Sequence, residues 1–230
     1  MSVVDVVVRR ATGDDIAFLS GVVADALAAS PVGGWLVPDP VERSQVLRCY
    51  ALLVLAHGVK YGQVDMTDDR TAVAVWYSRS QPTPVCAPYE FDLHRLFGPY
   101  AARFGLLHAC ADAVHPHTPH HYLAHLAVPS RRGAAARALL ASYHGVLDAA
   151  GLPAYAEVSS HRPRTELLAQ LGYLPRSPIS LQPGGPVLWR MWRPPPVVRQ
   201  PGGLPRRVRL HRGATPFHGR LIAAAVPRST

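Results

Sequence analysis

Apolar residues in the N-terminal part of the chain recur every three to four positions, which is the spacing of one helix face. This pattern predicts a helix over residues 14–29 and another over 39–57, closed by the glycine that follows. Between them, the proline and two glycines of residues 30–36 predict a loop. Thr12 and Asp15 stand at capping-box spacing, so the first helix should begin directly after them.

The rest of the chain alternates between strand-like and helix-like patterns. Strands are predicted over residues 3–8, 63–66, 71–77, 122–128, 154–158, 173–181 and 187–192, and helices over 90–114, with a break at 98–99, over 134–150 and over 164–171. The polar residues 67–70 are a turn of hairpin length, so the strands they join should be antiparallel. One strand–helix–strand crossover follows. The fold class is therefore α/β, or mixed α+β, with helices on both faces of a mixed, mostly antiparallel sheet.

The net charge of +9 is concentrated at the C-terminal end of the chain of 230 residues. Residues 194–230 hold seven arginines, no lysine and no acid, together with many prolines and glycines, and we expect this tail to be largely disordered. Residues 1–193 are close to neutral and form one expected domain. A rival interpretation makes the arginine-rich tail a nucleic-acid-binding element, but a basic tail is more often only solvated, so we do not expect nucleic acid as a partner.

No segment is long and apolar enough for a membrane-spanning helix, and no secretory signal pattern precedes the first strand, so we expect a cytoplasmic protein. Cys49, Cys86 and Cys110 are widely spaced, which favours reduced, structural thiols. The histidines of segment 115–121 lie in a proline-stiffened stretch without an accompanying acid or cysteine. We therefore predict no metal site.

A strand that ends directly at a helix N-terminus is the most informative local feature. Strand 122–128 is followed by Pro129-Ser130 and then by Arg131-Arg132-Gly133-Ala134-Ala135-Ala136. Small residues at such a junction let a ligand approach the backbone, and the free N–H groups of the first helical turn favour an anion. Arg131 and Arg132 would add positive charge for a pyrophosphate. An ordinary crossover with no ligand would show the same local pattern.

The order of these segments resembles the GNAT family of acyl-CoA-dependent N-acyltransferases, in which a YLxxLxV strand precedes an R/Q-x-x-G-x-G/A helix start. Arg131 matches the first position of the motif and Ala136 the last, whereas Ala134 replaces the usual central glycine. Within the family the chain is most similar to the puromycin N-acetyltransferase type, over roughly residues 3 to 193. The matching segments are 8–15, 71–76, 149–159, 171–173, 184–186 and 189–193.

This resemblance implies transfer of an acetyl or related acyl group from acetyl-CoA, or another acyl-CoA, to an amine of a small molecule. We expect the protein to be a monomer or a homodimer. Backbone amides near Leu126 and Val128 would bind the thioester and pantetheine, and those of residues 132–137 the pyrophosphate. The implied CoA-binding residues are Leu126, Ala127, Val128, Arg131, Arg132, Gly133, Ala134, Ala135, Ala136 and Arg137. Alignment and carbonyl polarisation can drive this reaction without a nucleophilic side chain.

The sequence offers two candidates for the catalytic base and none for the catalytic acid. Glu157 is a candidate base, directly or through water, and it could also be a structural acid or an anchor for the substrate amine. His125 is a second candidate base, and a packed histidine is the alternative. The resemblance places Leu168 where many relatives carry a tyrosine that acts as the general acid, and Arg164 where an asparagine is common. These departures favour an alternative in which the fold binds CoA or a small ligand without turnover.

Large aromatic residues could line the pocket of the acceptor. Trp35, Trp76 and Tyr77 are the candidates, because an aromatic wall would stack a ring-containing substrate. The alternative is that these side chains complete the hydrophobic core.

Overall fold

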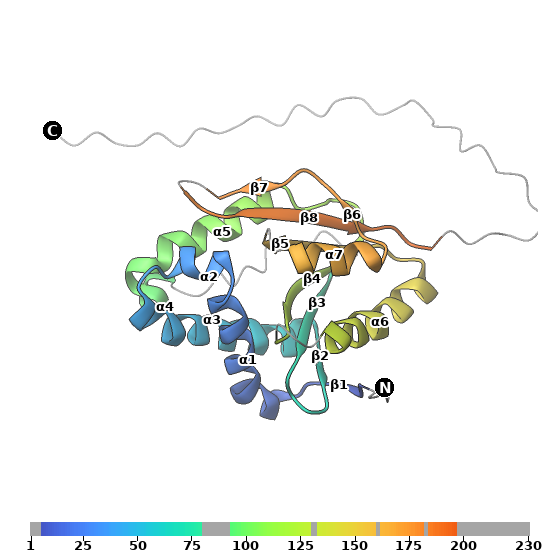
Figure 1. The fold of residues 1–230 in the computed structure, drawn as a ribbon, viewed down its shortest axis with the longest axis horizontal. Helices are drawn as coiled ribbons and strands as arrows, with labels where there is room; N and C mark the ends of the chain where they lie inside the picture. Colours follow the sequence, from blue (N-terminus) through green and yellow to red (C-terminus); the bar gives the residue numbers. More distant parts are fainter. Residues whose placement is uncertain (1–5, 80–92, 130–132, 160–161, 182–183, 197–230) are drawn as a thin grey trace, which may run out of the picture. The chain divides into compact units, whose positions relative to one another are not determined.

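The computed structural model describes residues 6–79, 93–129, 133–159, 162–181 and 184–196 (Figure 1). An eight-stranded sheet is the centre of the fold, in the order β1-β2-β3-β4-β5-β8-β6, and β7 also pairs with β8. The strands are β1 Val8–Arg10, β2 Gln63–Thr67, β3 Val73–Arg79, β4 His120–Ala127, β5 Ala154–Ser159, β6 Leu174–Pro175, β7 Ile179–Ser180 and β8 Val187–Arg193. The β4–β5 pair is parallel and the other pairs are antiparallel, so the predicted fold class and the predicted hairpin of β2 and β3 are confirmed.

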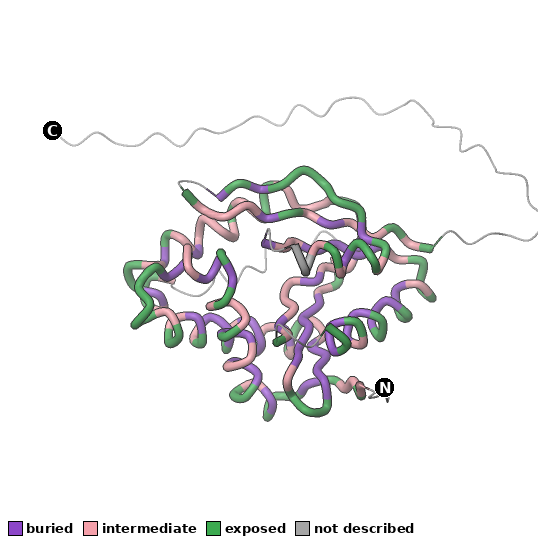
Figure 2. Tube along the Cα trace, in the orientation of Figure 1, coloured by how far each residue is buried: buried purple, intermediate pink, exposed green. Residues whose placement is uncertain are grey.

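Helices cover both faces of this sheet (Figure 1). They are η1 Gly13–Asp15, α1 Ile16–Ala28, α2 Pro31–Leu36, α3 Pro40–Tyr61, α4 Leu93–Phe97, η3 Gly98–Tyr100, α5 Ala101–Ala113, α6 Gly133–Ala150 and α7 Arg162–Gln170. Alternate residues of β3 point to opposite faces, as a pleated strand requires. Val73 and Val75 belong to the core under α1, α3 and α5, whereas Ala74 and Trp76 belong to the core under α6 and α7. Figure 2 shows the buried residues along the strands and the inward sides of the helices.

The predicted loop over residues 30–36 is wrong, because the helix α2 forms there. The Ser30 side chain accepts a hydrogen bond from the Gly33 N–H at 3.1 Å, and Pro31 occupies the first helical turn, where its missing N–H costs nothing. Gly33 is required by packing, since a Cβ atom at this position would lie 2.0 Å from the Leu27 carbonyl oxygen. The sequence pattern correctly located the break after α1 but not the short helix that follows.

The second predicted helix is longer than expected, because Gly58 lies inside α3 and Gly62 follows its end. A Cβ atom on Gly58 would lie 2.8 Å from Val75 Cγ1 and 2.9 Å from Val64 Cγ2. Gly58 therefore allows α3 to approach the sheet rather than ending the helix. The predicted strand 173–181 is likewise divided into β6 and β7.

Other predictions concern the ends of the chain and its general character. Of the tail 194–230, the described part is 194–196, so the predicted disorder lies outside the described residues, as does Cys86. Cys49 and Cys110 are free thiols. No helix within the described ranges is both long and apolar enough to cross a membrane.

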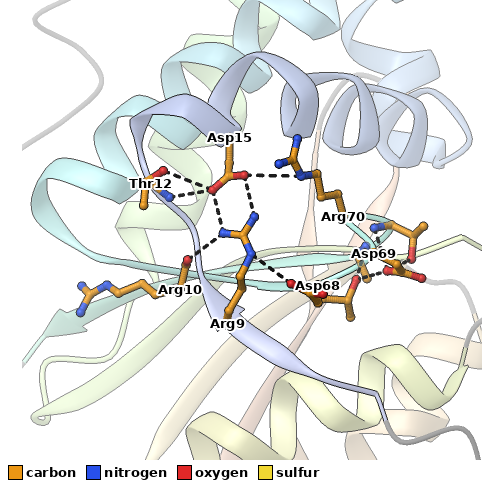
Figure 3. A network of polar contacts seen from close by, with 10 residues as sticks. Arg9, Arg10, Thr12, Asp15, Asp68, Asp69 and Arg70 are labelled. Carbon is orange, nitrogen blue, oxygen red and sulfur yellow. Dashed lines mark hydrogen bonds and ion pairs between the residues drawn. The ribbon is translucent and has the colours of Figure 1, made fainter.

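An ion pair between a half-buried arginine and a buried aspartate fixes the connection between β1 and α1 (Figure 3). The Arg9 guanidinium donates to the two carboxylate oxygens of Asp15 at 2.8 and 2.9 Å, and the Thr12 N–H donates to the same carboxylate at 3.0 Å. Arg70 approaches Asp15 at 3.8 Å, and Arg9 also contacts Asp68 at 3.5 Å. The hydrogen bonds from Arg9, and then that from Thr12, hold the pKa of Asp15 well below its usual range. The predicted capping box is thus present, with an aspartate in its acidic position.

We expect Asp15→Asn to lower the free energy of unfolding near neutral pH, because the neutral amide removes the carboxylate that accepts two hydrogen bonds from Arg9. The depressed pKa gives a sign to the pH dependence. The carboxylate contributes its stability above the unfolded-state pKa of about 3.9 and loses it as pH falls through the lower folded-state pKa. Urea unfolding of wild type and variant should therefore differ most near pH 7, and the difference should shrink in acid. Asp14→Asn, at an exposed neighbour, is the control, and a pH-independent difference for Asp15→Asn would contradict the assignment.

The two glycines of α2 provide a matched test of its packing. Gly34→Ala should be neutral or stabilise the protein by about 0.5–1 kcal/mol, because a Cβ atom there meets nothing within 4 Å and alanine favours the helix. Gly33→Ala should destabilise it by roughly 1–3 kcal/mol, since the methyl group meets the Leu27 carbonyl. Thermal unfolding of the two variants measures the difference. Equal effects would show that α2 does not pack against the end of α1.

Candidate active site

The parallel strands β4 and β5 separate after a short paired stretch. They pair at three positions, ending with Leu123 opposite Ala156, although β4 continues to Ala127 and β5 to Ser159. The cause lies on the other side of β4, where a register shift makes Val75 the partner of His125 and Trp76 the partner of Leu123. Ala124 is the extra residue of this bulge. A bulge bends its strand, and here it turns the end of β4 away from β5.

A cavity of about 660 Å³ lies at this divergence. Its walls include residues 123–127 of β4 and 156–159 of β5, together with side chains from α1, α3 and α5. Leu168 of α7 and Leu188 of β8 also contribute. Because the two strands no longer pair here, their facing backbone groups can hydrogen-bond to a bound molecule instead. Such a slot suits an extended, amide-containing ligand.

Glu157 lies in the wall of this cavity and is bound by two tyrosines. The Tyr122 hydroxyl donates to one carboxylate oxygen at 3.1 Å, and the Tyr155 hydroxyl donates to the other at 2.9 Å. Burial raises the pKa of Glu157, and the two tyrosine hydrogen bonds oppose that shift. Glu157 therefore holds a proton more readily than an exposed glutamate, which suits a group that accepts a proton near neutral pH.

His125 faces the same cavity from β4. Its ring lies 6.0 Å from that of Tyr50, in an edge-to-face arrangement, and burial lowers its pKa to about 4. The imidazole is therefore neutral near pH 7 and is a weaker proton acceptor than an exposed histidine. The structure thus brings both candidate bases of the sequence analysis, Glu157 and His125, to one cavity.

Besides His125, the cavity wall holds His57, His108, His115 and His117, none of which was identified from the sequence as a catalytic or binding residue. His57 Nδ1 lies 2.8 Å from the Tyr77 hydroxyl, and burial lowers the pKa of His57. Burial likewise lowers the pKa of His108 to about 4 and that of His115 to about 3. The sequence signal for these residues is weak, because they are spread over α3, α5 and the loop after α5 and only the fold brings them together.

The three aromatic candidates for an acceptor pocket occupy different places. Tyr77 lines the cavity. Trp76 does not: it is fully buried on the opposite face, with its ring stacked 4.3 Å from that of Tyr143. Trp35 lines a separate surface depression beside Arg103. Neighbouring strand residues point to opposite faces, so Trp76 and Tyr77 could not share one pocket.

The candidate CoA-binding residues divide between the cavity and the start of α6. Leu126 and Ala127 line the cavity, and Val128 packs beside it on the core under α6. Arg131 and Arg132 lie outside the described residues. In the first turn of α6, Ala135 and Ala136 are buried, whereas Gly133, Ala134 and Arg137 are exposed; the Arg137 guanidinium donates to Gln170 of α7. The start of α6 thus presents free backbone amides beside small or exposed residues.

Leu168 occupies the position at which many relatives carry a tyrosine that acts as the general acid. Leu168 is 1% exposed, lies on α7 and forms part of the cavity wall. Arg164 also belongs to α7. Leu168 cannot donate a proton, so protonation of a leaving group must come from elsewhere.

The histidine-rich segment does not form a metal-ligand cluster among the residues that the structure describes. His120 Nδ1 lies 2.7 Å from the Thr118 carbonyl oxygen, so this nitrogen carries the hydrogen. His120 Nε2 is then an acceptor, and His115 Nε2 lies 3.1 Å from it. The two imidazoles satisfy one another as neutral groups, which agrees with the lowered pKa of each.

Comparison with known proteins gives the family. No protein-family profile matches the chain, and no curated protein matches it in sequence. Among solved structures, it is similar to one from Corynebacterium glutamicum described as histone acetyltransferase HPA2 and related acetyltransferase. The two are 30% identical with a TM-score of 0.60, over 84% of this chain and 99% of that one.

Two further structures share the fold at lower identity. Arylalkylamine N-acetyltransferase 2 from Aedes aegypti is 12% identical, with a TM-score of 0.57, over 83% of this chain and 99% of its own. An agmatine N-acetyltransferase mutant is 15% identical, with a TM-score of 0.56, over 82% and 98%. Together with the separated β4 and β5 strands, the 30% identity over nearly a whole related chain is decisive: the protein belongs to the GNAT family and is an N-acetyltransferase.

Proposed function

We propose that the protein transfers the acetyl group of acetyl-CoA to a primary amine of a small molecule. The observation that carries this proposal is the cavity at the divergence of β4 and β5, which has a buried carboxylate, Glu157, in its wall. In this proposal the amine nitrogen attacks the thioester carbonyl carbon, a C–N bond forms, and the C–S bond then breaks to release CoA. Holding the two reactants side by side supplies much of the rate enhancement.

Two observations support acetyl-CoA as the donor. The backbone after Leu123, which has no strand partner on its β5 side, offers hydrogen bonds to the pantetheine amides and to the thioester oxygen, where negative charge develops. The first turn of α6, from Gly133, offers free N–H groups and the positive end of a helix dipole to the pyrophosphate. Arg137, exposed in that turn, adds positive charge.

Glu157 is the proposed general base, acting directly or through a water molecule. An amine is protonated near pH 7 and must lose its proton before, or as, it attacks. The two tyrosine hydroxyls fix the Glu157 carboxylate in one orientation, while its raised pKa makes it a better proton acceptor. His125 is the second proposed base. Leu168, which cannot act as a general acid, supports the alternative that the fold binds CoA without turnover. A thiol-release assay over an amine panel separates the transferase proposal from this alternative.

Finer parts of the proposal follow from the sequence. We place the protein with the puromycin N-acetyltransferase type, on the matches at segments 8–15, 71–76 and 149–159. Residues 1–193 would form the catalytic domain, and 194–230 a basic tail. Removing the tail should leave CoA binding intact, whereas a tail-dependent nucleic-acid binder would lose its salt-dependent affinity.

We expect Glu157→Gln to lower kcat/KM by roughly 10²–10⁴-fold, the range for loss of a general base. Because the pKa of Glu157 is raised, the carboxylate form that activity requires appears at a higher pH than for an exposed glutamate. The wild-type kcat/KM should therefore rise with pH through this ionisation, and the variant should lose that part of the profile. Glu166→Gln, at an exposed position of α7, is the matched control. An unchanged pH profile in Glu157→Gln would exclude the base role.

Ala134→Glu tests the site at the start of α6. The new carboxylate, at an exposed first-turn position, interacts favourably with the helix dipole, so the fold should remain stable. The same negative charge should repel a pyrophosphate. We expect the Kd for CoA to rise about tenfold, equivalent to about 1.4 kcal/mol. Val146→Glu, at a 62% exposed position of the same helix, adds the same charge away from the site and should leave the Kd unchanged. Equal Kd values for the two variants would place the pyrophosphate elsewhere.

A further inference from the structure

The cavity extends beyond the divergence of β4 and β5 into a chamber with apolar walls. Its side chains come from the inward faces of α1, α2, α3 and α5. The apolar members are Val23, Ala26, Leu27, Val32, Leu36, Leu53, Val54, Leu107 and Ala111. At about 660 Å³ the whole cavity is within the size range of sites for drug-sized ligands. Such walls gain free energy only from an apolar occupant.

Negative charge is confined to one part of this cavity. Glu157 and Asp112 are the described acids in its wall, and they are close enough for Asp112 to raise the pKa of Glu157. Burial lowers the pKa of His57, His108, His115 and His125, so these four histidines of the wall are neutral near pH 7. The ring of Tyr122, which binds Glu157 and also lines the cavity, offers aromatic surface to a cation. This part of the cavity therefore suits a single ammonium group.

Arg79 makes another part of the cavity wall unfavourable for a cation. It is the one described lysine or arginine in the wall, and its Nε atom is buried without a hydrogen-bond partner. Its positive charge lowers the pKa of both His57, on α3, and His115, just after α5. The guanidinium is therefore within electrostatic range of both residues. A second ammonium group on the same ligand would be repelled by this guanidinium.

We infer that the acceptor is a primary monoamine carried on a bulky apolar body, with its ammonium group beside Glu157 and Asp112 and its hydrocarbon in the chamber of α1, α2, α3 and α5. Diamines and polyamines of the same length are disfavoured by Arg79. This inference rests on the proposed function and specifies its substrate class. The charged end is held by electrostatics, whereas the length and volume of the body determine affinity.

The test uses the full chain and amines of graded length. Titration calorimetry with n-butylamine, n-hexylamine and n-octylamine should show Kd falling roughly three- to fourfold for each added methylene group. The matched diamine, 1,8-diaminooctane, should bind at least about tenfold more weakly than n-octylamine. Arg79→Gln should reduce this ratio between the two eight-carbon amines. A Kd that does not depend on chain length, or a diamine that binds as well as the monoamine, would overturn the inference.

A paired substitution on α5 tests the chamber itself. Ala111→Leu fills part of the wall and should weaken binding of n-octylamine by roughly tenfold or more, with about a twofold change at most for n-butylamine. Ala102→Leu, at an exposed position of the same helix, is the control for folding and should change neither value. Equal losses for the short and the long amine in Ala111→Leu would overturn the chamber as the binding site.

Release of CoA thiol, measured with the same amines, separates this inference from the proposed function. Chain-length-dependent binding without any thiol release would support the chamber and overturn the proposed transferase reaction on these amines. Thiol release with short amines and diamines alike, without dependence on chain length, would support the reaction and overturn the inference.

Discussion

The site depends on hydrogen bonds that β4 does not make. A strand inside a sheet normally satisfies its N–H and C=O groups on both sides, and an unpaired backbone group in the interior is costly. Here the bulge at Ala124 lets β4 keep its pairing with β3, while its pairing with β5 ends at Leu123. The backbone beyond that point faces a cavity instead of a neighbouring strand. A ligand with amide groups can take the place of the missing strand.

The surrounding structure holds the two strands apart. On one face, Trp76 and Tyr143 stack and bind α6 to β3, and on the other, Gly58 lets α3 lie against Val75 and Val64. At the far end of the sheet, the Arg9–Asp15 pair fixes where α1 begins. Helices anchored on both faces keep the gap between β4 and β5 from closing, so the cavity is a property of the packed fold.

The sequence predicted the parts of this structure that depend on local pattern. The hairpin of β2 and β3, the crossover through α6 and the cap at Thr12 and Asp15 all follow from periodicity and turn chemistry over short distances. The helix α2 was missed because its stability depends on the contact of Gly33 with α1, which no local pattern records. Gly58 was mistaken for a helix end for the same reason.

Candidate site residues show the same division. Glu157, His125 and Tyr77 lie in one cavity. The two candidate bases were proposed from the strand order that the family resemblance implies. Trp76 was proposed without considering which face of the sheet it occupies, and it is buried on the opposite face. The histidines at 57, 108 and 115 come from α3, α5 and the loop after α5, so no local spacing in the sequence connects all three. The bulge at Ala124, which opens the site, has no distinctive residue to mark it.

The two halves of the cavity come from separate stretches of the chain. The chamber walls belong mainly to α1, α2, α3 and α5, whereas the slot between the strands belongs to β4 and β5 and leads to α6. Substitutions in the first set can reshape the chamber without altering the backbone of the slot. In evolution, therefore, such a fold can change the size and shape of its chamber through a few helix-face changes while the slot between the strands is inherited unaltered.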